Sequence, residues 1–308
     1  MASTGGDEVN YHSFVRLMTH YVCNALFQSV AIVGNQQVAD ETFRVKINCP
    51  EIATAVLPGQ FVMLRIHGRN DPLIGRAFAM YDLFYSDDGT PAGIDIVYLV
   101  KGKFTQGLAL LGPGDRVDIG GPFGNTFSTD PVSHLVMAVG GVGQTPMLAV
   151  GREAIGTHTY GGNSMLEGTY RHGYAQKVTL LYGARTAGRF AGILDFQQAG
   201  FDLRLSTDDG SIGNPKQVTH LLRELLYELP SDESVRIVTC GPEPMMAAIA
   251  AIAEEKNISC QVSLETPMAC GIGICFTCVA KIRQPDGQWD YQRTCVEGPI
   301  FDAAKLSW

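Results

Sequence analysis

Four cysteines in the last 40 or so residues of the 308-residue chain have a spacing that suits metal chemistry. Their pattern is C-x4-C-x2-C-x16-C, formed by Cys270, Cys275, Cys278 and Cys295. Four thiolates complete the coordination of a two-iron, two-sulfur cluster, with two on each iron. Gly271 and Gly273 lie between the first two ligands and let the backbone fold tightly around an inorganic core. The pattern predicts a centre that transfers one electron at a time.

A zinc site is the alternative for these cysteines, because Zn²⁺ also binds four thiolates. Structural zinc sites more often use two C-x2-C knuckles, and this segment has one, between Cys275 and Cys278. The first three cysteines share the spacing of plant-type ferredoxins, although the gap to the fourth is shorter here. The spacing therefore favours the iron–sulfur interpretation and a redox role.

Two further turns lie between an apolar run and a helical pattern; the first favours phosphate binding, with a purely structural turn as the alternative. The segment Gly140-Gly-Val-Gly-Gln-Thr-Pro146 follows an apolar run and precedes a helical pattern. Its glycines allow close approach of a phosphate, and Thr145 and Pro146 have the types of a helix cap and a first helical residue. A second turn, Thr239-Cys-Gly-Pro-Glu-Pro-Met-Met246, also follows an apolar run and opens a helix. Two such turns at the ends of parallel strands predict a ligand crevice between them.

The elements that must hold these motifs fall into two classes. Between residues 26 and 130, alternating strands separated by Gly, Pro and Asp predict an antiparallel barrel. After Pro131, nearly all-apolar runs separated by helical patterns predict a parallel sheet covered on both faces. One helix is expected to begin at Asn214 and Pro215 and to bury a leucine stripe ending at Leu229.

Composition excludes some classes of function. The net charge of −8 argues against a nucleic-acid partner, which requires a basic surface. No apolar run is long enough to span a membrane, and the polar N-terminus lacks the pattern of a signal peptide. The other cysteines are scattered and suggest no disulfide framework; they are Cys23, Cys49, Cys240 and Cys260. We therefore expect a cytoplasmic protein that does not bind membranes.

The order of these motifs resembles that of the ferredoxin–NADP reductase superfamily over residues 26 to 256. The shared features are an Arg-x-Phe-x motif at Arg76 in the barrel, the glycine-rich turn, Leu-Tyr-Gly-Ala-Arg185 and Cys240-Gly-Pro-x-Pro-Met. Three segments narrow the resemblance to electron-transfer subunits of NAD-linked dihydroorotate dehydrogenase. They are the cysteine segment, Arg293-Thr-Cys-Val-Glu-Gly-Pro-Ile-Phe301 and Ser206-Thr-Asp-Asp-Gly-Ser-Ile-Gly213.

The resemblance implies four segments: an N-terminal extension (1–25), an FAD-binding barrel (26–130), an NAD-binding α/β domain (131–257) and a 2Fe-2S domain (258–308). Flavin contacts are implied for Arg76, Ala77, Phe78, Ala79, Val97, Tyr98, Leu99, Phe104 and Thr105. Nicotinamide cofactor contacts are implied for Gly140, Gly141, Gly143, Thr145 and Pro146, with Cys240 and Gly241 near the nicotinamide ring. Cys240 is interpreted as a positional residue or a small buried one, because no histidine accompanies it in sequence.

Two positions depart from the family pattern. The fourth residue of the first flavin motif is commonly Ser or Thr, whose hydroxyl bonds the flavin ring, and here it is Ala79. The second flavin turn commonly has Gly before Thr, and here it has Phe104. A changed flavin potential is the expected consequence, because hydrogen bonds at the ring tune it.

The implied function is a relay. A partner subunit containing FMN oxidises dihydroorotate, and electrons pass through the cluster and FAD to NAD, within a heterotetramer. NADP is not excluded, because Arg185 and Arg189 follow the second parallel strand. Two rival hypotheses remain open: a diaphorase subunit of another complex, such as a hydrogenase or a ferredoxin-dependent NADPH oxidoreductase, and a redox-sensing or scaffolding subunit without catalysis.

Two segments are extra relative to the family. Residues 156 to 173 are expected to form a surface loop at the sheet edge opposite the crevice, with a partner contact as the alternative. Residues 1 to 25 have a loosely helical pattern that could pack on a partner or on the barrel.

Overall fold

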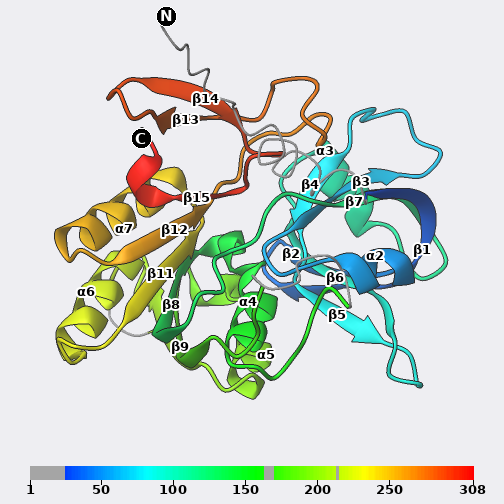
Figure 1. Ribbon diagram of the computed structural model, residues 1–308. Helices are drawn as coiled ribbons and strands as arrows, with labels where there is room; N and C mark the ends of the chain where they lie inside the picture. Colours follow the sequence, from blue (N-terminus) through cyan, green and yellow to red (C-terminus); the bar gives the residue numbers. More distant parts are fainter. Residues whose placement is uncertain (1–24, 163–169, 213–214) are drawn as a thin grey trace, which may run out of the picture.

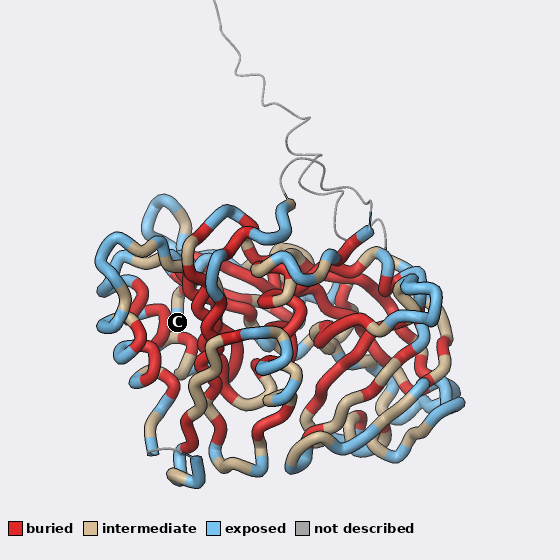
Figure 2. The backbone as a smooth tube through the Cα atoms, turned by 90° about the horizontal axis from the view of Figure 1, so that it is seen from below, coloured by how far each residue is buried: buried red, intermediate tan, exposed pale blue. Residues whose placement is uncertain are grey.

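The computed structural model describes residues 25–162, 170–212 and 215–308. The N-terminal extension, part of the 156–173 segment and Asn214 therefore lie outside the described residues. The described chain forms two lobes side by side, each with its own buried core, and a smaller C-terminal unit that contacts both (Figures 1 and 2).

The first lobe is a curled antiparallel sheet of seven strands in the order β4-β3-β7-β1-β2-β6-β5. The strands are β1 (Leu26–Ala39), β2 (Thr42–Asn48), β3 (Phe61–Ile66), β4 (Arg76–Ala79), β5 (Asp82–Tyr85), β6 (Pro91–Leu99) and β7 (Arg116–Phe123). Two short helices, α2 (Pro50–Ala55) and α3 (Lys103–Ala109), accompany them. Alternate residues point inward, so Val45, Ile47, Ile94 and Ile96 fill one core. The predicted barrel is confirmed.

The second lobe is a six-stranded sheet in the order β10-β9-β8-β11-β12-β15, with five parallel strands and β15 antiparallel at the edge. Its strands are β8 (Val132–Gly140), β9 (Ala175–Ala184), β10 (Asp202–Thr207), β11 (Val235–Cys240), β12 (Ser259–Ser263) and β15 (Ile300–Asp302). Its α-helices are α4 (Met147–Ala154), α5 (Ile193–Gln198), α6 (Val218–Glu228) and α7 (Glu243–Glu255). Short 3₁₀ turns are η1 (Gly141–Gln144), η2 (Ala187–Arg189) and η3 (Ala303–Lys305).

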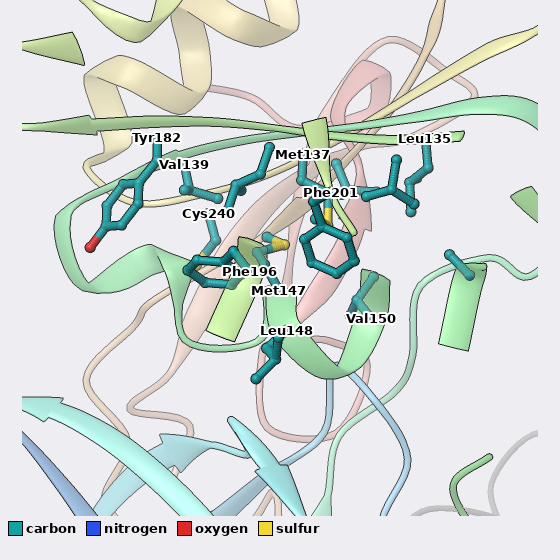
Figure 3. Close-up of a cluster of buried hydrophobic side chains, with 14 of the residues drawn as sticks. Leu135, Met137, Val139, Met147, Leu148, Val150, Tyr182, Phe196, Phe201 and Cys240 are labelled. Carbon is teal, nitrogen blue, oxygen red and sulfur yellow. The ribbon is translucent and has the colours of Figure 1, made fainter. Parts of the chain in front are cut away.

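Helices cover both faces of this sheet, which explains its apolar strands. In β8, Leu135, Met137 and Val139 pack with α4 and α5 on the side facing the barrel, as Figures 1 and 3 show. Val136 and Ala138 point the other way, into the core formed with α6 and α7. Because every second residue is buried on each face, the strand is apolar throughout. The predicted parallel sheet is confirmed.

One helix begins later than expected. Helix α6 starts at Val218, and Pro215 instead forms an isolated bridge with Thr207 at the end of β10. The prediction that Pro215 is the first helical residue was therefore wrong, because pairing with the neighbouring strand keeps this residue extended. The predicted leucine stripe is confirmed, since Leu221, Leu222 and Leu225 are buried.

The C-terminal unit joins the two lobes. Its hairpin consists of β13 (Val279–Arg283) and β14 (Trp289–Arg293), while β15 adds to the parallel sheet beside β12. The segment holding the first three cysteines has no helix or strand, and it packs against Phe61 and Met63 of the barrel strand β3. None of the described helices is both long and apolar enough to cross a membrane.

Candidate functional site

A large cleft of about 960 Å³ opens where the carboxyl ends of the parallel strands face the barrel. Open α/β sheets commonly bind ligands at this edge. Both turns singled out in the sequence reach it, since Gly140 and Gly141 line the cleft together with Gly241 and Pro242. The barrel contributes the β1–β2 corner and the end of β6, including Thr42, Leu99 and Lys101.

Glycine is required in the first turn for two different reasons. A Cβ on Gly143 would lie 2.3 Å from the carbonyl oxygen of Cys240, so only glycine lets the two turns pack together. Gly141 has a φ of +56°, and a Cβ there would meet nothing within 4 Å. The turn is thus closely packed on the protein side and open on the cleft side, as a cradle for a phosphate requires.

A buried carboxamide supports this interpretation of the turn. The side chain of Gln144 is fully buried, yet neither its nitrogen nor its oxygen has a hydrogen-bond partner among the described residues. An unpaired buried amide is costly, so a polar group of a bound molecule at this turn would stabilise it. The residues present therefore fit a polar ligand at this turn, and the open space over Gly141 leaves room for a phosphate.

The two residues after Gln144 lie at the helix start without the cap that the sequence suggested. The hydroxyl of Thr145 donates to the carbonyl oxygens of Val142 at 2.6 Å and Val97 at 3.3 Å, so it ties the turn to barrel strand β6. Pro146 takes the N-cap position, and the helix begins one residue later, at Met147. Thr145 thus links the two lobes.

A smaller pocket of about 320 Å³ lies deeper between the lobes. It is lined by most of the predicted flavin residues, namely Ala77, Phe78, Ala79, Val97, Tyr98 and Leu99. Thr145, Pro146 and Cys240 close it from the parallel-sheet side. Four residues line both cavities: Leu99, Lys101, Val142 and Glu265. The small pocket and the large cleft therefore meet, as a hydride-transferring pair of cofactors requires.

Three of the predicted flavin residues lie away from this pocket. Arg76 is exposed, and its guanidinium donates to the carbonyl oxygens of Ile74 and Gly75, both at 3.0 Å. Phe104 is buried in the barrel core beside Phe78, with ring centroids 5.8 Å apart. Thr105 accepts hydrogen bonds from the backbone of the turn before α3. The role of each toward a flavin stays a prediction.

Cys240 occupies the junction of the two lobes, beneath the turn and against α4 and α5 in Figure 3. It is 3% exposed, and burial raises the pKa of its thiol well above the usual value. A neutral thiol is a poor nucleophile. The positional role of Cys240 stays a prediction.

Glu265 lines the site but was not predicted from the sequence. Its Oε1 lies 3.7 Å from the sulfur of Cys240, and the residue lines both cavities. The side chain of Glu265 is exposed toward the cleft, and protein atoms surround its other sides. Desolvation by these atoms raises the pKa of the carboxyl group. The hydrogen bond from Cys240 and the charge of Lys101 lower the pKa by a smaller amount. Glu265 lies just beyond the end of β12. A charged residue directly after an apolar run is the feature of the sequence that could have identified it as a site residue.

Charged side chains gather at the far end of the large cleft. Arg185, Arg189 and Asp208 line it there. Arg189 forms an ion pair with Glu41 across the lobes at 2.5 Å. Asp208 follows β10, and no hydrogen bond or ion pair of its carboxylate is found among the described side chains.

The four predicted cluster ligands lie together. Cys275 interacts with its neighbour Cys270, and Cys295 interacts with Cys278 and, more weakly, with Cys270. Cys278 and Cys295 are both 1% exposed, whereas Cys275 is exposed. Hydrogen bonds from Thr277 and Cys270 lower the pKa of Cys275 to about 6, which favours its thiolate.

The surroundings fix the loop that carries these thiols. Gly271 has a φ of +72°, and a Cβ there would lie 2.7 Å from the side chain of Met63. Arg293 donates to the carbonyl oxygen of Gly273 at 3.0 Å and lies over the ring of Phe276, 5.2 Å from its centroid. The loop is thus held close to the barrel by backbone and side-chain contacts.

The number of cysteines in this region suits a two-iron cluster. A two-iron cluster needs two thiolates at each iron, and Cys270, Cys275, Cys278 and Cys295 supply four thiols. The residues therefore fit a 2Fe-2S cluster.

Comparisons with known proteins agree with this site. The profile of the family described as "Iron-sulfur cluster binding domain of dihydroorotate dehydrogenase B" matches residues 265–307. The "Dihydroorotate dehydrogenase B (NAD(+)), electron transfer subunit" of Desulforamulus reducens is 31% identical over 90% of this chain and 97% of its own. The protein of the same name from Caldanaerobacter subterraneus subsp. tengcongensis is 29% identical over 89% and 96%.

Solved structures show the same fold. An NADH-dependent reduced ferredoxin-NADP oxidoreductase shares 25% identity with a TM-score of 0.73 over 91% of this chain and 90% of that one. A ferredoxin NADP+ reductase from Neisseria gonorrhoeae, solved with bound FAD and NADP, has a TM-score of 0.57 at 17% identity over 75% and 91%. The second likeness concerns the fold alone.

Proposed function

The chain belongs to the family of dihydroorotate dehydrogenase B electron transfer subunits, and from this membership we propose that it passes electrons from a dihydroorotate-oxidising partner to NAD, in pyrimidine biosynthesis. One observation carries the proposal. The large cleft, the small pocket and the cysteine loop are consecutive, because Glu265 lines both cavities and Met268 lines the small pocket two residues before Cys270. The order of the sites is the order that the reaction needs.

The chain's own residues have separate tasks in this proposal. The small pocket, walled by β4 and β6, would hold FAD, and the glycine turn would hold the phosphates of NAD. Bound FAD supplies the exchange between single electrons and hydride, since the cluster carries one electron and nicotinamide accepts two. Leu99, Val142 and Glu265 line both cavities where they meet, and Cys240 lines the small pocket beside them.

An exposed apolar surface near the cysteine loop supports a partner. Ile274 is 74% exposed and Phe276 64%, and both lie beside Cys275 on the loop. Exposed apolar side chains at a redox centre are typical of a docking face. We propose that the FMN-containing catalytic subunit binds here, in a heterotetramer, and that the complex acts in the cytoplasm.

The charges at the far end of the large cleft support NAD over NADP. A carboxylate near the adenosine ribose accepts a hydrogen bond from the 2′-hydroxyl and repels a 2′-phosphate. Asp208 is placed at that end of the cleft, while Arg189 is already paired with Glu41. Arg185 also lines this end of the cleft, and its guanidinium would suit a 2′-phosphate. Tighter binding of NADP than of NAD is therefore the second outcome that a comparison of the two cofactors can give.

The test uses the chain isolated without oxygen together with the partner it retains. We expect NADH formation that depends on dihydroorotate and disappears when the partner is removed. The matched control is the Cys49→Ala protein, which lacks a buried thiol far from the cluster ligands and should keep the activity. Reduction of flavin and cluster by NADH without any response to dihydroorotate would contradict the proposal and favour a diaphorase subunit of another complex.

A further inference from the structure

The segment that links α4 to β9 lies at the expected sheet edge opposite the cleft, and it also contacts the barrel. Its described parts, residues 157–162 and 170–173, are called the strap below. The backbone nitrogen of Thr157 donates to the oxygen of Arg152 at 3.0 Å, and that of Gly173 to the oxygen of Glu153 at 2.8 Å. Both ends of the strap are therefore anchored at the last turn of α4.

The strap places a tyrosine in the barrel core. Tyr160 is 3% exposed and packs with the barrel's buried residues, and its hydroxyl donates to Oδ1 of Asp82 in β5 at 2.8 Å. The next residue, Gly161, lies over α2, and a Cβ there would be 2.4 Å from Leu57. The expectation of a simple surface loop was wrong for these residues, because Tyr160 is buried between the lobes.

Asp82 joins the strap to α4. Its carboxylate is 4% exposed, and its second oxygen forms an ion pair with Arg152 in the last turn of that helix. At the other end, Thr145 bonds the barrel through the carbonyl oxygen of Val97. Helix α4 has eight residues and is therefore about 12 Å long. The barrel thus holds this short helix at both ends.

We infer that Tyr160 is a positioning residue for electron transfer between the two cavities. Through Asp82 and Arg152 it fixes α4, and α4 begins directly after the glycine turn that lines the large cleft. Hydride transfer needs reacting atoms about 3 to 3.5 Å apart, so a small displacement of the turn slows it strongly. The inference rests on the proposed flavin and nucleotide sites, and it does not depend on the identity of the partner.

The experiment compares Tyr160→Phe with Tyr174→Phe in the flavin-loaded and cluster-loaded protein. Tyr174 is also buried and lies next to the strap, but no hydrogen bond of its hydroxyl is found among the described residues. Stopped-flow mixing with NADH gives the maximal rate of flavin reduction and the NADH concentration at half that rate. We expect Tyr160→Phe to lower the maximal rate of flavin reduction about tenfold, because a 1 Å displacement of reacting atoms lowers a rate by up to about 100-fold. The half-saturating NADH concentration should stay within about twofold of the wild-type value.

A second readout does not depend on activity. Amide hydrogen exchange in α4 and in the glycine turn should become faster in Tyr160→Phe and stay unchanged in Tyr174→Phe. If Tyr160→Phe does not fold, Asp82→Asn removes the charge that holds Arg152 and should give the same slower flavin reduction. A wild-type rate and unchanged exchange would overturn the inference. A wild-type protein whose flavin NADH cannot reduce would instead refute the proposed function.

Discussion

The large cleft and the cysteine loop are both cofactor sites, yet the chain builds them in opposite ways. The cleft is formed by backbone at the ends of parallel strands, where Gly143 packs against β11 and Gly141 faces open space. The loop offers four thiols from a segment whose first three cysteines lie outside any helix or strand. The sheet fixes the cleft through its strands, whereas the loop is fixed by contacts of Gly271 with Met63 and of Arg293 with Gly273.

The strongest way to separate the two sites is to remove a buried cluster ligand. In Cys278→Ala the cluster should be lost entirely, because one iron loses a thiolate and Cys295 loses its buried partner. Iron content and the visible spectrum measure this loss. FAD and NADH binding should persist, since the cleft does not rely on the loop for its backbone. Loss of NADH binding in the same variant would show that the two sites fold as one.

The converse change breaks the cleft and leaves the loop. In Gly143→Ala the new methyl group meets the backbone of Cys240 at 2.3 Å, so the two turns must move apart. We expect the NADH dissociation constant to rise roughly 100-fold, which corresponds to about 2.7 kcal/mol. Equilibrium titration checks this, with iron content unchanged. Gly112→Ala is the matched control, because a Cβ at Gly112 meets nothing within 4 Å and should leave the binding of NADH intact.

The same contrast explains what could be predicted from the sequence. Strand ends and glycine turns follow from local patterns, so the prediction of a crevice between the two turns is confirmed. Cysteine spacing likewise identified four thiols that lie together. Contacts between distant segments leave little local pattern: the sequence does not show that Tyr160 packs in the barrel core, and only its place after an apolar run marks Glu265. The start of α6 was misjudged because Pro215 pairs with Thr207 across the chain.

One buried carboxyl group, that of Glu153, makes the stability of the parallel-sheet lobe depend on pH. Glu153 in α4 is 1% exposed, and burial raises its pKa from 4.5 to about 8, although a hydrogen bond from Tyr170 opposes the shift. The folded state therefore holds this proton more tightly than the unfolded state. The resulting stability is complete below pH 4.5 and is lost as the pH rises towards about 8.

Denaturant unfolding at several pH values measures this effect. Glu153 should contribute a decrease in the free energy of unfolding of up to about 1.4 kcal/mol per pH unit between these limits. Glu153→Gln should remove that contribution, because the amide does not titrate. Arg76→Gln is a control, since Arg76 is exposed and lies in β4. Its guanidinium donates to the carbonyl oxygens of Ile74 and Gly75 and not to α4. An equal pH slope in wild type and Glu153→Gln would show that the carboxyl group ionises freely in the folded protein.

The smallest expected effect lies in the pocket between the two sites. Ala79 lines the small pocket and has no side-chain hydrogen-bonding group, where relatives in the superfamily commonly have a hydroxyl. Ala79→Ser would add one hydrogen bond to the flavin, worth about 1 kcal/mol, and should shift the two-electron flavin potential by about 20 mV. Spectroelectrochemical titration measures the shift, and Ala77→Ser in the same strand is the control for a general change of polarity. In the proposed relay both the cleft and the loop exchange electrons with this pocket, so a shift confined to Ala79→Ser would show that its wall tunes the flavin directly. Equal shifts in both variants would show that only the polarity of the pocket matters.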